Sequence, residues 1–418
     1  PHYFNSLIQL YCIHKQVRGH KKRNTMIKEL RISNFRCYKD TSIVFKDISI
    51  LVGKNNSGKS TLIEALRISA VITYRYKNLQ FHKSPAWLKL ETESYGVSPS
   101  IENLDISTQN IFYHYGDPPS NIEVIFNNKT RIETYVGEDA PIFAMIFDQN
   151  NTEIKTKGQA KIIEIPIINI LPQISPLRRE EKIVKFQTVQ SNLLTKLSSR
   201  NFRNQIKYFN SDFEKFRDLA EKTWKGLTVD NIKNLSGFVD EPLQLMIRDN
   251  GFTAEIGWMG HGLQMWLQTM WFIARSDKQS IVILDEPDVY MHADLQRRLI
   301  RLITNQYQQL IIATHSVEIM AEVESENILP IDSAKKRLTH AKSLPFVQKL
   351  IDDIGSIHNI EIARIFTSKK FLIVEGDKDD IKILSLLQGI LFPETHEPFD
   401  TIPKTFVEGW GGWQRVIG

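Results

Sequence analysis

The sequence predicts an α/β fold that carries a β-rich lobe and a helical insertion. Residues 48–52, 281–284 and 310–314 form short, apolar, largely β-branched runs, and each has a stretch of helical spacing beside it. Runs of this length and composition are typical of buried strands in a parallel sheet. Buried strands that alternate with helices predict the α/β class, with helices covering the sheet.

Two further regions depart from that pattern. Alternating polar and apolar side chains predict half-buried strands at residues 27–32, 41–45, 122–126, 131–136 and 142–147. Residues 77–120 are polar and contain prolines, so we expect loops there. No proline occurs between Pro176 and Pro242, where apolar residues recur at helical spacing; this predicts the helical insertion.

The net charge is concentrated at the start of the chain. Residues 1–25 contain five lysine and arginine side chains and no acid, so their formal charge of +5 equals that of the whole chain. The remaining residues are therefore neutral, and the basic isoelectric point does not indicate nucleic-acid binding by the main body. We expect Met26 to be the natural start and residues 1–25 to be an extension, with a basic nucleic-acid arm as the alternative.

Composition also limits the cellular setting. Cys12 and Cys37 are the two cysteines, too few for a disulfide framework, which fits a reducing compartment. No apolar run approaches the ~20 residues that a transmembrane helix needs. We therefore expect a cytoplasmic protein that makes no membrane contact.

Residues 53–60 read Gly-Lys-Asn-Asn-Ser-Gly-Lys-Ser and fit the phosphate-binding pattern G-x-x-x-x-G-K-[ST]. The glycines let backbone amides face a polyphosphate at a helix N-terminus. Lys59 is expected to reach the β- and γ-phosphates of ATP, and the Ser60 hydroxyl to bind Mg²⁺. The loop residues expected to contact nucleotide are Gly53, Asn55, Asn56, Ser57, Gly58, Lys59, Ser60 and Thr61.

Polar side chains follow three predicted strands, residues 281–284, residues 310–314 and the mostly apolar run 162–170. Asp285 and Glu286 stand at the C-terminal end of one, the edge where open α/β sheets bind ligands. Asp285 is expected to hold Mg²⁺ through water, and Glu286 to orient or deprotonate the attacking water. His315 is expected to sense the γ-phosphate, with a structural histidine as the alternative. Gln173 is expected to contact the metal or the water, with a plain surface-loop residue as the alternative.

Residues 260–264, which we call the signature segment, open a predicted helix with Gly260, His261 and Gly262, followed by Gln264. Glycines at a helix start make an anion site. Such a site would be redundant opposite its own phosphate loop. It is expected instead to bind the γ-phosphate of ATP held by a second copy, which implies a homodimer enclosing two ATP molecules. A helix cap with glycines is the alternative.

The order of these motifs resembles that of ABC-type P-loop ATPases, and more narrowly of the group with RecF- and SMC-like heads. Residues 31–36 are similar to the opening strand of that group, in which Arg36 matches an arginine near the nucleotide. Asp288 falls in the matching D-loop. His261 stands where the family usually has Ser, and Ala293 where it usually has Pro. The first departure puts the hydrolysis rate in doubt, though not nucleotide binding.

Residues 371–379 resemble the start of an α/β Toprim domain, in which an apolar strand presents Glu375 and an acid, Asp379, follows four residues on. An ABC-type ATPase followed by Toprim resembles the OLD (overcoming lysogenization defect) family nucleases, which include effectors of bacterial anti-phage systems. The resemblance implies Mg²⁺ or Mn²⁺ at these acids. No D-x-D run follows a later apolar strand, so we expect an incomplete nuclease site and a chain that is a fragment, with a degenerate nuclease as the alternative.

The resemblance implies a DNA-associated ATPase that forms a homodimer or a higher homo-oligomer and gates a Toprim endonuclease. Whether a regulatory protein or a nucleic-acid element also binds is left open. A RecF- or SMC-like repair or clamp ATPase without nuclease activity is the alternative. The predicted parts are an extension (1–25), the head's first part (26–176), a dimerisation or DNA-facing helical insertion (177–240), the head's second part with signature, acid pair and His (241–335), a connector (336–368) and an incomplete Toprim domain (369–418).

Overall fold

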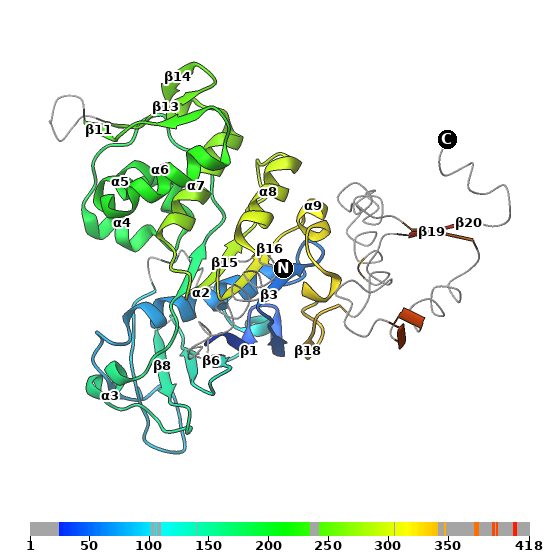
Figure 1. The fold of residues 1–418 in the computed structure, drawn as a ribbon. Coiled ribbons are helices and arrows are strands. Elements are labelled where there is room, and N and C mark those ends of the chain that lie inside the picture. The colour runs from blue at the N-terminus through cyan, green and yellow to red at the C-terminus, as the bar shows by residue number, and fades with distance from the viewer. Residues whose placement is uncertain are drawn as a thin grey trace, which may run out of the picture.

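The computed structural model describes residues 25–101, 104, 106, 110–139, 141–234, 242–304, 306–341 and 347, and then residues 372–375, 387–388, 390–391 and 404–407. A five-stranded parallel sheet, a six-stranded mixed sheet and a group of helices make up most of the described chain (Figure 1). The predicted α/β fold is confirmed. Apart from Thr25, the predicted N-terminal extension lies outside the described residues.

The parallel sheet is the centre of the molecule. Its order is β17-β3-β16-β15-β9, with β3 (Ile48–Val52), β9 (Ile168–Leu171), β15 (Ile281–Asp285), β16 (Gln309–Ala313) and β17 (Ile328–Pro330). Successive side chains point to opposite faces: Ile283 lies in the core shared with the mixed sheet, and Leu284 in the core on the other face. Both faces are therefore buried, as the apolar runs predicted.

Helices cover the two faces unequally. The helix α2 (Lys59–Arg75) packs in the core between the two sheets. On the other face lie α7 (His261–Arg275), α8 (Ala293–Ile303) and α9 (Val317–Ala321), which bury Trp266, Leu299 and Ile319. This arrangement places the N-terminus of α2 directly after β3, where the phosphate loop connects them.

The mixed sheet corresponds to the predicted β-rich lobe. Its order is β18-β2-β1-β6-β7-β8, with β1 (Ile27–Phe35), β2 (Tyr38–Val44), β6 (Ser120–Phe126), β7 (Arg131–Val136), β8 (Ile142–Phe147) and β18 (Arg337–Leu338). β1 runs three residues past the predicted end, because pairing with β2 continues to Phe35. β18 pairs with β2 although sequence spacing assigned it to a connector. Smaller elements beside this sheet are β4 (His82–Lys83), β5 (Tyr95–Gly96), η3 (Tyr113–Tyr115) and α3 (Lys157–Ile162).

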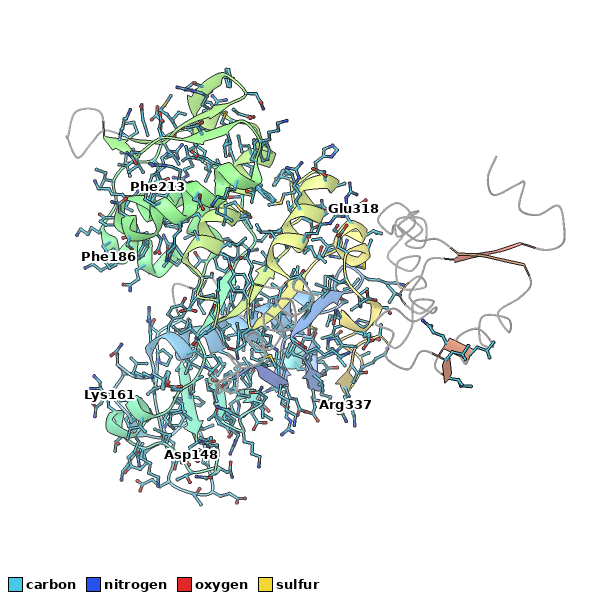
Figure 2. All side chains as sticks on the ribbon, in the orientation of Figure 1. Asp148, Lys161, Phe186, Phe213, Glu318 and Arg337 are labelled. Carbon is cyan, nitrogen blue, oxygen red and sulfur yellow. The ribbon has the colours of Figure 1, made fainter. Side chains whose placement is uncertain are left out.

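The helical group stands beside α7 and contains short helices. They are α4 (Phe186–Asn192), η4 (Lys196–Asn201), α5 (Phe202–Tyr208), η5 (Asn210–Asp212) and α6 (Phe213–Thr223). Figure 2 labels Phe213 within this group, and it is buried with Phe216 against Trp271 of α7. The group ends in a small sheet formed by β10 (Leu227–Val229), β13 (Met246–Asp249) and β14 (Phe252–Glu255). The predicted boundary at residue 240 thus divides strands that share one sheet.

The remaining described elements are β11 (Lys233–Asn234), β12 (Leu243–Gln244), η6 (Ile256–Trp258), η7 (Ser325–Asn327), β19 (Leu372–Glu375) and β20 (Lys404–Val407). β19 matches the predicted apolar strand that ends at Glu375, and β20, which sequence patterning missed, pairs with it in parallel. The strand character of β20 was hidden by Lys404 and Thr405, which interrupt an apolar pattern. Asp379 lies outside the described residues. None of the described helices is long and apolar enough to cross a membrane.

Candidate functional site

The predicted polar residues meet at one edge of the parallel sheet. β3 pairs with β16 and β16 with β15, all parallel, so their C-terminal ends lie together. The phosphate loop follows β3, the acid pair Asp285-Glu286 ends β15, and His315 lies just after β16. Gln173 follows β9, the strand on the other side of β15. Parallel pairing therefore collects side chains from four segments that are far apart in the sequence.

The phosphate loop needs its two glycines for different reasons. Gly58 caps α2 with φ 104°, a left-handed conformation that residues with a Cβ adopt with strain. A Cβ there would also lie 2.6 Å from the Tyr38 hydroxyl. A Cβ on Gly53 would lie 2.5 Å from the Ser57 Oγ and 2.7 Å from the Ile331 carbonyl oxygen. The loop is consequently held in a tight curl that leaves no room for a side chain at either glycine.

Lys59 and Ser57 are the buried polar side chains of this curl. The Lys59 Nζ donates to the carbonyl oxygens of Gly53 at 2.8 Å and Lys54 at 3.1 Å. Burial lowers the pKa of Lys59, while the carboxylates of Glu286 and Asp285 act in the opposite direction. The Ser57 Oγ is buried and has no hydrogen-bond partner among the described residues. The unpartnered Ser57 hydroxyl and the neighbouring Lys59 ammonium form a phosphate cradle, in which a phosphate oxygen would supply the missing hydrogen-bond partner.

A cavity of about 670 Å³ opens over this cradle. Its lining joins the loop to the acid pair and the switch region, and consists of Arg36, Cys37, Asn55, Asn56, Ser57, Gly58, Lys59, Ser60, Thr61, Asn110, Phe112, His114, Tyr115, Glu286 and His315. Arg36, predicted to lie near a nucleotide, is in this lining and forms an ion pair with Glu64 of α2 at 2.6 Å. The volume is in the range of small-molecule and cofactor sites.

Some of these cavity residues were missed by sequence reasoning. Asn110, Phe112, His114 and Tyr115 come from the segment that we expected to form featureless loops. Tyr115 is 80% exposed, an unusual state for a large aromatic side chain. The signal available in the sequence was the cluster of aromatic side chains in an otherwise polar segment, residues 112–115.

Glu286 is the point on which the neighbouring side chains converge. The Gln173 Nε2 donates to its Oε2 at 2.8 Å, and the His315 Nε2 lies 3.7 Å from its Oε1. Burial, followed by the charge of Lys59, lowers the pKa of His315, so the imidazole is neutral near pH 7. Glu286 itself has φ 48°, a left-handed conformation that is uncommon for residues other than glycine. The backbone thus holds this carboxylate in a fixed, strained position of the kind found at functional sites.

Asp285 and Asp288 flank Glu286 and carry costly charges. Burial, together with the neighbouring Glu286, raises the pKa of Asp285 to about 6. Burial also raises the pKa of Asp288, although a hydrogen bond from the Thr314 hydroxyl opposes the shift. A carboxyl with a raised pKa is a group that a nearby cation would return to its ionised form.

These groups fit a divalent cation shared with a ligand. No cluster of three or more His, Cys, Asp or Glu side chains suited to a metal occurs among the residues that the structure describes. Mg²⁺ is commonly held by one or two protein oxygens together with phosphate oxygens and water, rather than by a protein cage. Ser60, Asp285 and Gln173 supply oxygens of the required kind.

The signature segment does not contribute to the cavity of its own chain. Gly260 caps α7, and His261 is exposed, with its ring 5.7 Å from that of Tyr290. Gln264 differs from the prediction, because its side chain is 2% exposed and is used within the chain. Its Oε1 accepts from the Leu177 backbone N–H at 2.7 Å and its Nε2 donates to the Met259 carbonyl at 2.7 Å. Its amide faces the interior rather than a ligand.

Two protein-family models match the chain. The AAA ATPase domain matches residues 26–166, which include the phosphate loop. The AAA domain described as a putative AbiEii toxin of a type IV TA system matches residues 175–321, which include the signature segment, the acid pair and His315. The two matches thus contain the two sequence segments that the parallel sheet brings together. They support an ATPase.

Two curated proteins are similar over most of the chain. The OLD nuclease of Thermus scotoductus (strain ATCC 700910 / SA-01) is 24% identical over 448 residues, covering 94% of this chain and 79% of that protein. Endonuclease GajA of Bacillus cereus (strain VD045) is 20% identical over 402 residues, covering 86% of this chain and 67% of that protein. Among solved structures, the Smc head domain with an extended coiled coil from Pyrococcus furiosus aligns with a TM-score of 0.48 at 16% identity, covering 79% of this chain and 100% of that chain.

Proposed function

Since the sequence and its relatives support an OLD-family ABC-type ATPase, we propose that this chain binds ATP with Mg²⁺ and hydrolyses it at the edge of the parallel sheet. The single observation that carries the proposal is the convergence on Glu286. An amide from Gln173 and an imidazole from His315 lie against this carboxylate, on the wall of the cavity that contains Lys59. A carboxylate held beside a phosphate cradle is the arrangement that activates water for phosphoryl transfer.

Each residue has a distinct proposed role. The amides of residues 53–61 and the Lys59 ammonium bind the phosphates, and Arg36 lies at the rim of the same cavity. Glu286 accepts the proton of the attacking water, while Gln173 orients the carboxylate. His315, neutral near pH 7, is placed to donate a hydrogen bond to the γ-phosphate. Mg²⁺, held by Ser60, Asp285 and Gln173, would neutralise charge that develops on the phosphates.

A second copy of the chain is proposed to complete the site. The signature segment, with Gly260, His261 and Gly262 at the start of α7, lies outside its own nucleotide cavity. A helix start that presents the exposed Gly260 and His261 is suited to bind the γ-phosphate of ATP held by a partner, with Asp288 and its neighbours where the two copies meet. ATP binding would then close a homodimer, or a higher assembly built from such pairs.

The described β19 ends at Glu375, which fits the opening strand of a Toprim domain. We propose that Glu375 and Asp379 bind Mg²⁺ or Mn²⁺ for phosphodiester cleavage of DNA, and that closure of the ATPase dimer gates this nuclease. The relatives named as nucleases support this class of activity. A role against phage DNA would place the protein in the cytoplasm, with a regulatory protein or nucleic-acid element as a further partner.

The test uses the full-length protein with plasmid DNA, Mg²⁺ or Mn²⁺, and ATP. We expect the wild-type protein to hydrolyse ATP and to cleave DNA. Lys59→Ala should abolish hydrolysis, because nucleotide no longer binds. Glu375→Ala should abolish DNA cleavage while ATP hydrolysis continues. ATP hydrolysis without cleavage in any metal would instead favour a clamp ATPase of the RecF or SMC kind. Unchanged hydrolysis in Lys59→Ala would refute the assignment of the phosphate loop.

A further inference from the structure

A segment that we call the strap, residues 173–184, runs from the candidate catalytic centre to the helical group. It begins at Gln173, whose amide donates to Glu286. The Ser175 carbonyl accepts from the Gln268 Nε2 at 3.0 Å, and the Leu177 N–H donates to the Gln264 Oε1 at 2.7 Å. Two backbone groups of the strap are thus tied to the first turns of α7, which begins with the signature segment.

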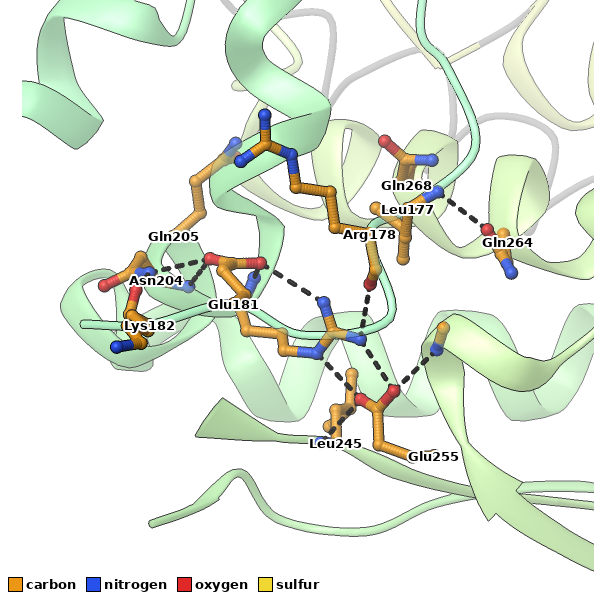
Figure 3. A network of polar contacts seen from close by, with 12 residues as sticks. Leu177, Arg178, Glu181, Lys182, Asn204, Gln205, Leu245, Glu255, Gln264 and Gln268 are labelled. Atoms are coloured by element: carbon orange, nitrogen blue, oxygen red, sulfur yellow. Dashed lines mark hydrogen bonds and ion pairs between the residues drawn. The ribbon is translucent and has the colours of Figure 1, made fainter. Parts of the chain in front are cut away.

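Farther along, Arg178 and Glu181 of the strap lie near Glu255 (Figure 3), and a fully buried arginine bonds to all three. Arg203 of α5 is 0% exposed and forms a two-pronged bond with Glu255, from Nε and from Nη2, both at 2.7 Å. Its Nη2 also donates to the Arg178 carbonyl at 3.1 Å, and its Nη1 lies 3.4 Å from Glu181. The Arg203 guanidinium therefore links two residues of the strap, Arg178 and Glu181, to Glu255 at the end of β14.

Glu181 is anchored by more than this ion pair. It accepts from the backbone N–H groups of Arg203 at 2.9 Å and Asn204 at 2.7 Å, at the N-terminus of α5. The Asn204 side chain donates to the same carboxylate at 2.7 Å. Burial raises the pKa of Glu181, and these hydrogen bonds oppose that shift. The second carboxylate of the cluster is thus balanced by a helix N-terminus and an amide.

Glu255 carries the connection to the signature segment. Its Oε2 accepts from the Gly257 N–H at 2.7 Å, three residues before Gly260. A Cβ at Gly257 would lie 2.7 Å from the Arg178 carbonyl oxygen and 2.9 Å from the Arg203 Nη2. The chain entering the signature segment therefore touches both the strap and the guanidinium, with no room for a side chain between them.

We propose that Arg203 is a positioning residue that couples Gln173 to the signature segment, by holding the strap and residues 255–260 in one rigid unit. The proposal rests on the proposed ATPase function. A change in what Gln173 contacts, from Glu286 alone to a metal or water, would move the strap. Because the strap is bonded to Gln264, Gln268 and Arg203, that movement would reposition Gly260 and His261 where a second copy binds.

Energetics favour a positioning role over a purely stabilising one. Buried ion pairs are costly to desolvate, and well-packed apolar side chains of similar volume often stabilise a fold equally well. An apolar cluster would however lack the directional bonds that fix the strap against Gly257. The charged cluster therefore serves to fix the position of the strap. The forked guanidinium of an arginine can do this through several directional hydrogen bonds, and the ammonium of a lysine cannot.

The experiment compares Arg203→Lys and Arg203→Met with Arg275→Met as matched control. Arg275 is a partly buried arginine of this region, stacked on Phe209 at 4.2 Å and bonded to Gln205. Within the described part of the chain it forms no hydrogen bond or ion pair with the strap. We expect both Arg203 variants to bind ATP within about twofold of wild type and to lose about 100-fold in kcat, the cost of misplacing groups by about 1 Å. Arg275→Met should keep wild-type kcat.

Hydrogen exchange of residues 257–264 supplies a readout that lost stability alone would not reproduce. ATP should protect these amides in wild type and in Arg275→Met, and should not do so in Arg203→Lys. If Arg203→Met does not fold, Arg203→Lys decides the matter, because it keeps the charge. Wild-type kcat with ATP-dependent protection in a folded Arg203 variant, or equal losses in Arg275→Met, would overturn the proposal. A wild-type protein that neither binds nor hydrolyses ATP would instead overturn the proposed function.

Discussion

The nucleotide cavity and the strap cluster both gather charged side chains, yet they satisfy them in opposite ways. In the cluster, Arg203 is fully buried and its donors reach two carboxylates and a carbonyl. In the cavity, the Ser57 hydroxyl has no partner among the described residues and Lys59 turns back onto the carbonyls of its own loop. Polar groups whose hydrogen bonds are all made within the protein hold the backbone in place. Polar groups that lack a partner, or that are held in a strained conformation, are available to bind a ligand.

This difference explains why two neighbouring motifs behave differently. Gln264 and Gln173 are both amides predicted to serve nucleotide chemistry. Gln173 contacts Glu286 on the cavity wall, and Gln264 bonds the strap inside the protein. Gln173 is thus a side chain placed at the ligand site, whereas Gln264 holds the backbone of the segment on which a second ligand site is proposed. The predictions below test that separation, beginning with the largest effect.

Glu286→Gln should reduce ATP hydrolysis by about 100- to 10,000-fold, because an amide cannot accept the proton of the attacking water. ATP binding should persist, since the side chain keeps its shape. A fluorescent ATP analogue measures binding and phosphate release measures hydrolysis. Glu318→Gln, on α9 and paired with Arg297, is the control and should hydrolyse normally. Hydrolysis within about threefold of wild type in Glu286→Gln would remove Glu286 from the catalytic role.

Asp285→Asn should stabilise the nucleotide-free protein at pH 8 by about 1 to 3 kcal/mol while abolishing hydrolysis. The pKa of Asp285 is about 6 in the folded protein, above the 3.8 of a free carboxyl. The neutral carboxyl therefore favours folding below about pH 4, and this advantage is lost as the pH rises through 6. Thermal unfolding of both proteins from pH 4 to 8 measures the difference, which should vanish at pH 4. A pH-independent difference would contradict the prediction.

Gly58→Ala should cost about 2 kcal/mol of stability and weaken ATP binding. Gly58 has φ 104° and an added Cβ would meet the Tyr38 ring. Gly251, between β13 and β14, has φ 89° with open space around it, so Gly251→Ala isolates the cost of backbone strain alone. Denaturant unfolding and nucleotide titration check both variants. Equal losses of stability in the two variants would show that contact with Tyr38 is unimportant.

Tyr38→Phe should have the smallest effect, about 1 kcal/mol of stability with a modest loss of ATP affinity. The Tyr38 hydroxyl donates to the Gly58 carbonyl at 3.1 Å and supports the phosphate loop. Tyr208→Phe removes an equivalent bond, to the Val184 carbonyl at 2.7 Å at the end of the strap. Its stability cost should be similar and its effect on ATP affinity absent. Urea unfolding and ATP titration of the pair compare the two regions directly.

Much of the site could be predicted because its signals are local. The phosphate loop and the acid pair are each encoded by residues adjacent in sequence, and each stands at the end of an apolar run. Parallel pairing then brings the ends of those runs together, which also placed Gln173 and His315 near Glu286. The cavity residues Phe112, His114 and Tyr115 were missed because irregular segments carry no periodicity from which their position could be inferred.

The sequence by itself determined the phosphate loop, the order of buried strands and the polar residues at their ends, since these depend on neighbours a few residues apart. Tertiary structure alone decided which buried charges pair. Arg203 and Glu255 are separated by 52 positions, and only the tertiary fold brings the Arg203 Nε to 2.7 Å from the Glu255 carboxylate. It also turned Gln264 inward and joined β18 to β2. Desolvation makes each buried polar group require a partner, but the fold determines which partner is within reach.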